Sequence, residues 1–368
     1  MTERIALVSP YALSVFGGVQ EQVLAMSREL GRRGREVLVI CPDSSDQAVY
    51  DTPARVRRFG RLISLPANGS RAPLTLSPVA SRRAKRALEA FAPDVVHFHE
   101  PFAPLLGWAA LRSHETPQVA TFHRSGGGPA FSLARPLLRS LARSVDASAS
   151  VSDAAAGTIR REVGVDAKVL FNGFETDRFV LTPRSRGDET VLVCVGRLEE
   201  RKGTRYALNA VLRHNARGRD QWRLVIIGDG PERARLEALA GDDEMILFAG
   251  ALDDVAKRQW LRRANALIAP ATRGESFGLV LLEAMASETL VVASDIPGYR
   301  EAAATHAVLF EPANEESLEE ALVRGLAHES DEAVASARRH AERWSMSVLM
   351  DEYESLYESA HRRFSEAR

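Results

Sequence analysis

Short β-rich runs alternate with amphipathic helical stretches along this chain of 368 residues, and the series begins a second time past residue 188. Runs of this kind, with a helix between most of them, form parallel sheets that helices cover on both faces. Two series in one chain therefore predict two doubly wound α/β domains. The strands expected in the first series are 5–9, 36–41, 94–99, 118–122, 147–152 and 168–171, and those in the second are 190–195, 222–228, 245–249, 264–269, 290–294 and 307–310.

The join between the two series falls at 179–189, a polar segment rich in residues that break helices and strands. We therefore expect an N-terminal domain at 1–180 and a C-terminal domain at 181–345. The amphipathic helix expected at 346–368 packs back across both domains. Because doubly wound sheets bind ligands at the carboxyl ends of their strands, two such domains predict an active site in the cleft between them.

The composition, with 45% apolar and 26% charged residues, is typical of a soluble globular protein. No run approaches the length of apolar sequence that a membrane-spanning helix needs. The chain starts directly with an expected strand, which argues against a secretory signal peptide. The two cysteines, Cys41 and Cys194, fall in expected buried strands and are interpreted as core thiols in a reducing cytoplasm.

Basic residues cluster in the first half of the chain: 52–88 holds nine of them and no acidic residue. A stretch of one sign this long suggests an anionic partner. Within it, the helix expected at 78–91 has one face that carries Arg82, Arg83, Lys85 and Arg86, and an opposite, apolar face that consists of Val79, Ala80, Ala84, Ala87, Leu88 and Phe91. This pattern fits a helix that lies on an anionic membrane, and it fits equally well a surface helix packed on a sheet.

The segment that contains Glu275 and Glu283 gives the clearest indication of which ligand the chain binds. Glu275 follows a loop and precedes an apolar helix that contains Glu283. The free N–H groups at such a helix start favour an anion, above all phosphate. The two carboxylates lie about two turns apart and can accept hydrogen bonds from hydroxyl groups. A sugar nucleotide combines both features, although an acid in a first turn can also simply complement the helix dipole.

Three further patterns follow expected strands. Gly17-Gly18, after the first strand, lets the backbone approach a phosphate, as can any tight turn. Arg197 and Lys202, after the first strand of the second series, could hold a diphosphate or form a solvated basic loop. His123 ends a strand and could donate a hydrogen bond or shuttle a proton, although a lone histidine is more often structural.

His97 and His99 point the same way from one strand, but no third residue with metal-ligand spacing accompanies them, so no metal site is expected.

Taken together, these motifs resemble family 4 of the retaining glycosyltransferases, whose fold, GT-B, consists of two Rossmann-like domains. The resemblance spans essentially the whole chain. It rests on Gly17-Gly18-Val19, His99-Glu100-Pro101, Thr121-Phe122-His123, Asn172-Gly173-Phe174-Glu175, Gly196-Arg197, Arg201-Lys202-Gly203, and Glu275-Ser276-Phe277-Gly278 with Glu283.

Within that family the chain is similar to actinobacterial phosphatidylinositol mannosyltransferases. Asn68-Gly69-Ser70, the basic helix after Pro78 and Asp253 with Lys257 match this subgroup. Two features depart from its pattern: Ser14 stands at an acidic position, and the loop from Arg197 to Lys202 is one residue short.

The resemblance implies a role for each matching residue. The catalytic residues would be His123, Arg197, Lys202 and Glu275. The donor would be bound by Gly18, Arg197, Lys202, Asp253, Lys257, Glu275, Ser276, Phe277, Gly278, Leu279 and Glu283, with Arg197 and Lys202 neutralising the diphosphate in place of a metal ion. The acceptor head group would be bound by Tyr11, Gln20, Asn68, Ser70 and Arg71 in the N-terminal domain.

The function expected from the resemblance is transfer of mannose from GDP-mannose to phosphatidylinositol or a related anionic lipid. The enzyme would be cytoplasmic and peripheral on the inner face of the plasma membrane. It would need no cofactor and would bind no nucleic acid. One alternative keeps the fold but uses a UDP-sugar donor and a soluble acceptor, either inositol phosphate or a polysaccharide. Another is a sugar-nucleotide epimerase or a non-catalytic binding protein on the same scaffold.

Overall fold

The computed structural model places the chain in two compact units. They comprise Met1–Phe174 with Met346–Arg368, and Glu175–Ser345. The first boundary lies a few residues before the expected join, and the last helix belongs to the first unit. The residues that the structure describes are 2–14, 17–43, 50–67, 70–124, 129–179, 189–218, 220–275 and 277–368, with the side chains of 64–67, 70–72 and 129–132 outside the description.

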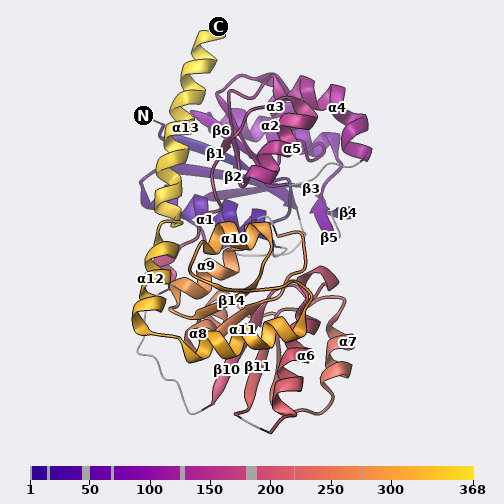
Figure 1. Cartoon of the computed structure of the whole chain (residues 1–368). Helices are drawn as coiled ribbons and strands as arrows, with labels where there is room; N and C mark the ends of the chain where they lie inside the picture. Colours follow the sequence, from indigo (N-terminus) through magenta and orange to yellow (C-terminus); the bar gives the residue numbers. More distant parts are fainter. Residues whose placement is uncertain are drawn as a thin grey trace. The chain divides into compact units, whose positions relative to one another are not determined.

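The first unit is built on a parallel sheet of seven strands in the order β3-β2-β1-β6-β7-β8-β9 (Figure 1). Two further strands pair antiparallel as a separate two-stranded sheet, β4-β5. The strands are β1 (Arg4–Val8), β2 (Glu36–Asp43), β3 (Arg55–Arg61), β4 (Ile63–Ala67), β5 (Ser70–Leu74), β6 (Val95–His99), β7 (Gln118–Phe122), β8 (Ala147–Ser150) and β9 (Lys168–Val169).

Helices cover both faces of this sheet and create two hydrophobic cores. One core forms against α1 and α13, and the other forms against α2, α3, α4 and α5. The helices are α1 (Gly18–Arg32), α2 (Pro78–Phe91), α3 (Trp108–Ser113), α4 (Pro129–Ala142), α5 (Asp153–Val163) and α13 (Met346–Glu366).

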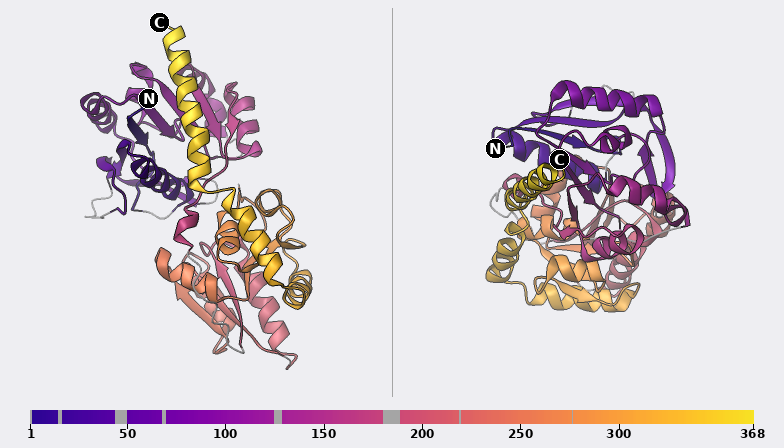
Figure 2. Two further views of the ribbon diagram at one scale, coloured as in Figure 1. Left: turned by 90° about the vertical axis from the view of Figure 1, so that its left-hand side faces the viewer. Right: turned by 90° about the horizontal axis from the view of Figure 1, so that it is seen from above.

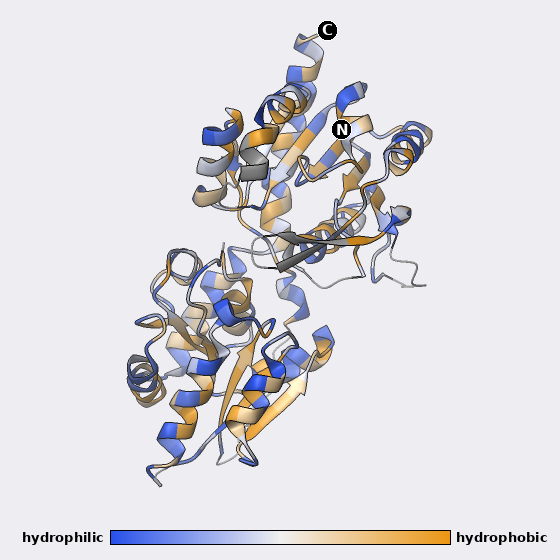
Figure 3. Ribbon diagram, turned by 90° about the vertical axis from the view of Figure 1, so that its right-hand side faces the viewer, coloured by the Kyte–Doolittle hydropathy of each residue, from blue (hydrophilic) through white to orange (hydrophobic). Residues whose placement is uncertain are grey.

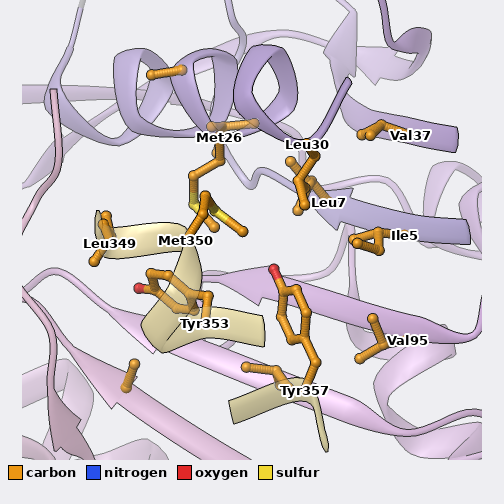
Figure 4. Close-up of a cluster of buried hydrophobic side chains, with 14 of the residues drawn as sticks. Ile5, Leu7, Met26, Leu30, Val37, Val95, Leu349, Met350, Tyr353 and Tyr357 are labelled. Carbon is orange, nitrogen blue, oxygen red and sulfur yellow. The ribbon is translucent and has the colours of Figure 1, made fainter. Parts of the chain in front are cut away.

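The C-terminal helix α13 is an integral part of the first unit (Figure 2). Its apolar side chains are spaced at three and four residues, so they share one face. Figure 4 shows Met350, Tyr353 and Tyr357 of this helix pointing into the same core as Met26 and Leu30 of α1. Both tyrosines are fully buried. The sequence nearest the C-terminus therefore completes a core that the N-terminal strands begin.

The second unit has a parallel sheet of six strands in the order β12-β11-β10-β13-β14-β15. Its strands are β10 (Thr190–Val195), β11 (Trp222–Ile227), β12 (Ile246–Gly250), β13 (Ala266–Ala269), β14 (Leu290–Ser294) and β15 (Val308–Phe310). Its helices are α6 (Thr204–Asn215), α7 (Arg233–Ala240), α8 (Asp254–Arg263), α9 (Leu279–Ala286), α10 (Pro297–Ala303), α11 (Glu315–Ala327) and α12 (Asp331–Glu342), with short 3₁₀ turns at η1 (Thr176–Arg178) and η2 (Glu200–Lys202).

Both parallel sheets reverse their strand order at one point, between β1 and β6 in the first unit and between β10 and β13 in the second. This is the topological switch point at which doubly wound sheets bind ligands. The central strands are apolar along most of their length, whereas most of the helices alternate apolar and polar positions (Figure 3). The predicted fold class is confirmed, and each predicted strand matches a strand of the structure within a residue or two.

The prediction missed three strands, β3, β4 and β5. Strand β3 is an edge strand, paired only with β2, and four of its seven residues are arginine. Edge strands carry charged side chains readily, so the apolar alternation that reveals a strand is absent there. No helix of the described residues is long and apolar enough to cross a membrane.

Candidate functional site

The predicted donor residues of the second unit gather at its switch point. Arg197 and Lys202 follow β10, and Glu275 follows the neighbouring strand β13. Lys202 Nζ lies 2.7 Å from Glu275 Oε1. The side chain of Glu275 is only 12% exposed, so this ion pair is screened little by solvent. The structure thus brings together a cation and a carboxylate that are far apart in the sequence.

Two residues that the prediction did not assign connect this pair to Arg197. Arg201 donates from Nη1 to Glu275 Oε1 at 2.8 Å and from Nε to Glu199 Oε2 at 3.1 Å. Glu199 Oε1 in turn lies 2.9 Å from Arg197 Nε. The side chain of Glu199 is 8% exposed. A continuous chain of alternating charges therefore runs from Arg197 through Glu199 and Arg201 to Glu275 and Lys202.

The short loop between Arg197 and Lys202 folds as the 3₁₀ turn η2 and ends at Gly203. Gly203 has φ 68°, and a Cβ atom there would lie 2.0 Å from the carbonyl oxygen of Pro270. Only glycine satisfies both conditions. Thr272 N–H and Oγ1 donate to the carbonyl of Arg201, which ties the loop after β10 to the loop after β13.

Glu283 of α9 has a defined partner on the preceding helix, α8. Lys257 Nζ lies 2.8 Å from Glu283 Oε1 and 3.2 Å from Asp254 Oδ1. Burial alone would lower the pKa of Lys257, but the Glu283 and Asp254 carboxylates outweigh it and raise that pKa. Lys257 is therefore charged at neutral pH and holds Glu283 in place. Asp253 has a structural contact: its Oδ1 caps α8 by accepting from Ala256 N–H at 2.8 Å.

The start of α9 is held by packing. Phe277 is buried and its ring contacts that of Trp344, with centroids 4.6 Å apart. Gly278, the N-cap, has φ 89°, and a Cβ atom there would lie 2.7 Å from Tyr299 Cδ1. Leu279 is the first residue of the helix. These contacts fix the segment whose backbone N–H groups are left without intrahelical partners.

In the first unit, three histidines stack beside the switch point. His97 and His99 of β6 have ring centroids 4.5 Å apart, and His99 Nδ1 lies 3.0 Å from Nε2 of His123, just past β7. Burial lowers the pKa of His97 and of His123 to about 3, so both rings are neutral at pH 7. His123 can therefore make neutral hydrogen bonds but does not supply a charge.

These histidines are anchored from α13. His97 Nδ1 lies 3.0 Å from the Tyr357 hydroxyl, and His97 Nε2 lies 2.7 Å from Thr121 Oγ1. Thr121 Oγ1 lies 2.9 Å from the Tyr353 hydroxyl. Within the described residues, no three histidine, cysteine, aspartate or glutamate side chains are placed to hold a metal ion.

Glu100 fixes the backbone at His123. Its Oε1 accepts the N–H groups of His123 and Arg124 at 2.5 and 2.6 Å. Burial raises the pKa of Glu100, against the opposing effect of these hydrogen bonds. Glu100 has φ 46°, an unusual conformation for a residue other than glycine, and such strain clusters at functional sites. Glu100 belongs to a motif noted in the sequence, but no role was assigned to it there.

The predicted acceptor residues are described only in part. Tyr11 follows β1, and its pKa is raised by burial and by the nearby Glu100 carboxylate. Gln20 is buried in α1 beside Gly17, and Gly18 begins that helix. Asn68 and Ser276 lie outside the described residues. Ser70 and Arg71 are in β5, with side chains outside the description.

The basic face of α2 differs from the prediction in two ways. Val79, expected on the apolar face, is 53% exposed, whereas Ala80, Ala84, Leu88 and Phe91 are buried as expected. Lys85 is paired with Glu89 at 2.7 Å and with Glu115 at 3.1 Å. Its charge is therefore offset by two carboxylates. Arg82, Arg83 and Arg86 are exposed.

Comparison with known proteins identifies the family of this chain. Residues 16–178 match the family described as Glycosyltransferase Family 4, and residues 189–328 match the family described as Glycosyl transferases group 1. The chain belongs to glycosyltransferase family 4. It is 36% identical to a phosphatidyl-myo-inositol mannosyltransferase of Mycobacterium leprae, over 97% of this chain and 96% of that protein. A protein of the same name from Propionibacterium freudenreichii is 30% identical over 99% and 97%.

Solved structures with low sequence identity share the fold of this glycosyltransferase. Sucrose-phosphate synthase from Thermosynechococcus elongatus matches with a TM-score of 0.78 at 20% identity, covering 100% of both chains. A glycosyltransferase from Rickettsia africae matches with a TM-score of 0.77 at 16% identity, covering 98% of both. The predicted GT-B architecture is confirmed.

Proposed function

We propose that this enzyme transfers mannose from GDP-mannose to phosphatidylinositol, with retention of configuration, at the inner face of the plasma membrane. The observation that carries the proposal is the cluster of Arg197, Arg201, Lys202 and Glu275 at the switch point of the second unit. The names of the relatives that match over nearly their whole length support the choice of mannose and of phosphatidylinositol.

The diphosphate of the donor is the group that this cluster suits best. Departure of GDP leaves negative charge on the diphosphate, and fixed cations aimed at developing charge are effective because they need no reorganisation. Arg197 and Lys202 supply these cations, and the N–H groups at the start of α9 add their dipoles. No divalent metal ion is then required to neutralise the leaving group.

The two glutamates suit the hydroxyl groups of the donor. Glu275, held between Arg201 and Lys202, accepts hydrogen bonds from the transferred sugar. Glu283, held by Lys257, accepts them from the ribose. His123 is neutral, and Glu100 fixes its backbone, so its ring contributes a hydrogen bond to the transferred sugar.

Membrane attachment through α2 is the second part of the proposal. Leu76 and Val79 are 43% and 53% exposed beside the exposed Arg82 and Arg83. Apolar side chains flanked by arginines are typical of a helix that lies in the interface of an anionic bilayer. Because each basic residue adds about 1 kcal/mol near such a surface, Arg82→Gln should weaken vesicle binding about fivefold. Lys85→Gln is the matched control, because its carboxylate partners already offset that charge.

The decisive experiment incubates the purified full-length chain with radiolabelled GDP-mannose and vesicles that contain phosphatidylinositol, with and without a chelator. We expect labelled lipid in both reactions. Parallel reactions use UDP-sugars with inositol phosphate as the acceptor. Transfer in these reactions alone would favour the soluble-acceptor alternative, and loss of turnover with chelator would contradict the metal-free mechanism.

A further inference from the structure

A groove of about 390 Å³ lies between α2 and the strands β1, β2 and β3 of the first unit. Its polar lining consists of arginine alone: Arg4, Arg55, Arg57, Arg83 and Arg86. The rest of its lining is apolar and consists of Leu38, Phe59, Ala87, Ala90 and Phe91. None of the described residues that line it is acidic.

The arginines converge because of the local secondary structure. Arg55, Arg57 and Phe59 alternate along β3, so they share one face of the strand. Arg83 and Arg86 are three residues apart on α2 and therefore lie on one side of that helix. The contacts of α2 with β3 bring the two pairs together across the groove. A strand and a helix thus contribute two arginines each.

These arginines lack the partners that other basic residues of the unit have. Among the described residues, no ion pair or hydrogen bond involves the guanidinium groups of Arg55, Arg57, Arg83 or Arg86. Only Arg4 has a carboxylate near it, with its Nε 3.7 Å from Glu36 Oε2, and its guanidinium lies over the Phe91 ring at 4.6 Å. By contrast, Arg33 and Arg35 both pair with Glu354 of α13.

The groove is separate from the candidate catalytic residues of the same unit. Arg4 and Arg55 are the first residues of their strands, and Phe91 is the last residue of α2. The groove therefore lies toward the amino ends of the parallel strands. Tyr11, Glu100 and His123 follow the carboxyl ends of strands in the same sheet.

We propose that this groove is a second anion site, which binds the phosphate group of a ligand. Guanidinium groups offer paired N–H donors that match phosphate oxygens, and several of them around one groove suit an anion with more than one negative charge. The apolar part of the lining accommodates the carbon part of a phosphate ester. The phosphate can come from a free anion or from the head group of a lipid, since Arg83 and Arg86 also belong to the helix expected at the membrane.

Arginine modification mapped by mass spectrometry tests the proposal on the full-length chain. Phenylglyoxal reacts with accessible arginines, and a bound phosphate protects them. One arm adds inorganic phosphate, and the other adds phosphatidylcholine vesicles that contain phosphatidylinositol. We expect Arg55, Arg57, Arg83 and Arg86 to be protected together, while the exposed helical residues Arg112 and Arg139 stay reactive. The readout needs neither sugar donor nor turnover, so it stands apart from the transfer reaction.

The two arms distinguish the source of the phosphate. Protection by inorganic phosphate identifies a site for a free anion, and protection by vesicles alone identifies a lipid head group. Vesicles that shield Arg83 and Arg86 but leave Arg55 and Arg57 reactive would show that α2 binds the membrane by itself, and the groove proposal would be wrong. Absence of protection in both arms would overturn it as well.

Paired substitutions give an independent measurement of binding in the arm that protects. R55Q/R57Q should lower the affinity for phosphate or for vesicles roughly 30-fold, because two cations are lost. R112Q/R139Q removes the same charge outside the groove and serves as the matched control, whereas R55K/R57K should restore part of the affinity. Equal affinity of R55Q/R57Q and R112Q/R139Q would contradict the proposal.

Discussion

Lys202 Nζ and Arg201 Nη1 both contact the same oxygen of Glu275, Oε1, at 2.7 and 2.8 Å. The carboxylate proposed to bind the donor sugar thus neutralises a cation proposed to bind the donor diphosphate. A diphosphate that enters this cluster competes with Glu275 for the same positive charge. The proposed donor site is therefore an ion-pair network that a bound diphosphate would rearrange.

This competition predicts opposite effects of Glu275→Gln on binding and on turnover. The amide removes one negative charge beside the diphosphate, so the affinity for GDP should stay equal or rise. The transfer rate should fall roughly 100-fold, because a charged contact to the transferred sugar is lost in the transition state. Calorimetry with GDP and initial rates with GDP-mannose measure the two effects separately.

Glu237→Gln is the matched control, because Glu237 is paired with Arg233 on the exposed surface of α7. It should leave both quantities at the wild-type level. If Glu275→Gln weakened GDP binding and left the transfer rate unchanged, the assignment of Glu275 to the sugar would be wrong.

Arg201 is predicted to be a positioning residue. It bridges Glu199 and Glu275 through different nitrogen atoms and also donates to the carbonyl of Gly274 at 3.2 Å. Lysine carries the same charge but lacks the planar fork, so Arg201→Lys cannot make all three contacts. We expect kcat to fall roughly tenfold, the equivalent of one lost charged hydrogen bond, with a smaller change in KM. Arg235→Lys, on exposed α7, is the control, and a wild-type kcat for Arg201→Lys would exclude the positioning role.

Much of the fold could be predicted because buried parallel strands are apolar along most of their length. Such strands are visible in sequence as short runs, and their number and spacing predicted two doubly wound sheets. Strand β3 could not be recognised, because its arginines face solvent and the groove while β2 supplies its pairing. The place of α13 in the first unit could not be predicted either. It depends on contacts between residues far apart in the sequence, such as that of Tyr357 with His97.

The candidate site was predicted less completely than the fold. Arg197 and Lys202 were proposed because they follow an expected strand, and Glu275 because it precedes an apolar helix that contains Glu283. Glu199 and Arg201 were not assigned, because Arg201 reaches Glu275 across two loops and no local sequence pattern shows that contact. The pairing of Lys85 with Glu115 could not be predicted either, because it arises only through the contact of α2 with α3, whereas Glu89 follows Lys85 at i+4 on the same helix.

Gly278→Ala should both destabilise the second unit and weaken donor binding. An alanine at φ 89° is strained, and its Cβ would press against the ring of Tyr299 at 2.7 Å. We expect the free energy of unfolding to fall by about 1–3 kcal/mol. GDP affinity should fall as well, because Phe277 and the start of α9 must shift. Gly164→Ala is the control: Gly164 has φ 80°, but a Cβ atom there meets nothing within 4 Å. Equal losses in both variants would show that backbone strain alone is responsible.

Acidification should destabilise the first unit through its buried histidines. Burial lowers the pKa of His97 from 6.5 to about 3, so the unfolded chain binds a proton at this residue between these pH values and the folded chain does not. The free energy of unfolding therefore decreases as the pH falls below 6.5, by at most about 1.4 kcal/mol per pH unit for this histidine. Above pH 6.5 both states are neutral at His97 and the contribution is constant.

His97→Gln isolates this effect, because glutamine can keep hydrogen bonds to Tyr357 and Thr121 but does not titrate. Urea denaturation at pH 7 and pH 5 should give a smaller difference in the free energy of unfolding for His97→Gln than for the wild type. His328→Gln, at an exposed histidine of the second unit, is the matched control for loss of a histidine as such. The same pH difference in wild type and His97→Gln would mean that the buried ring becomes protonated without unfolding, and the polar contacts from α13 would then tolerate a charged His97.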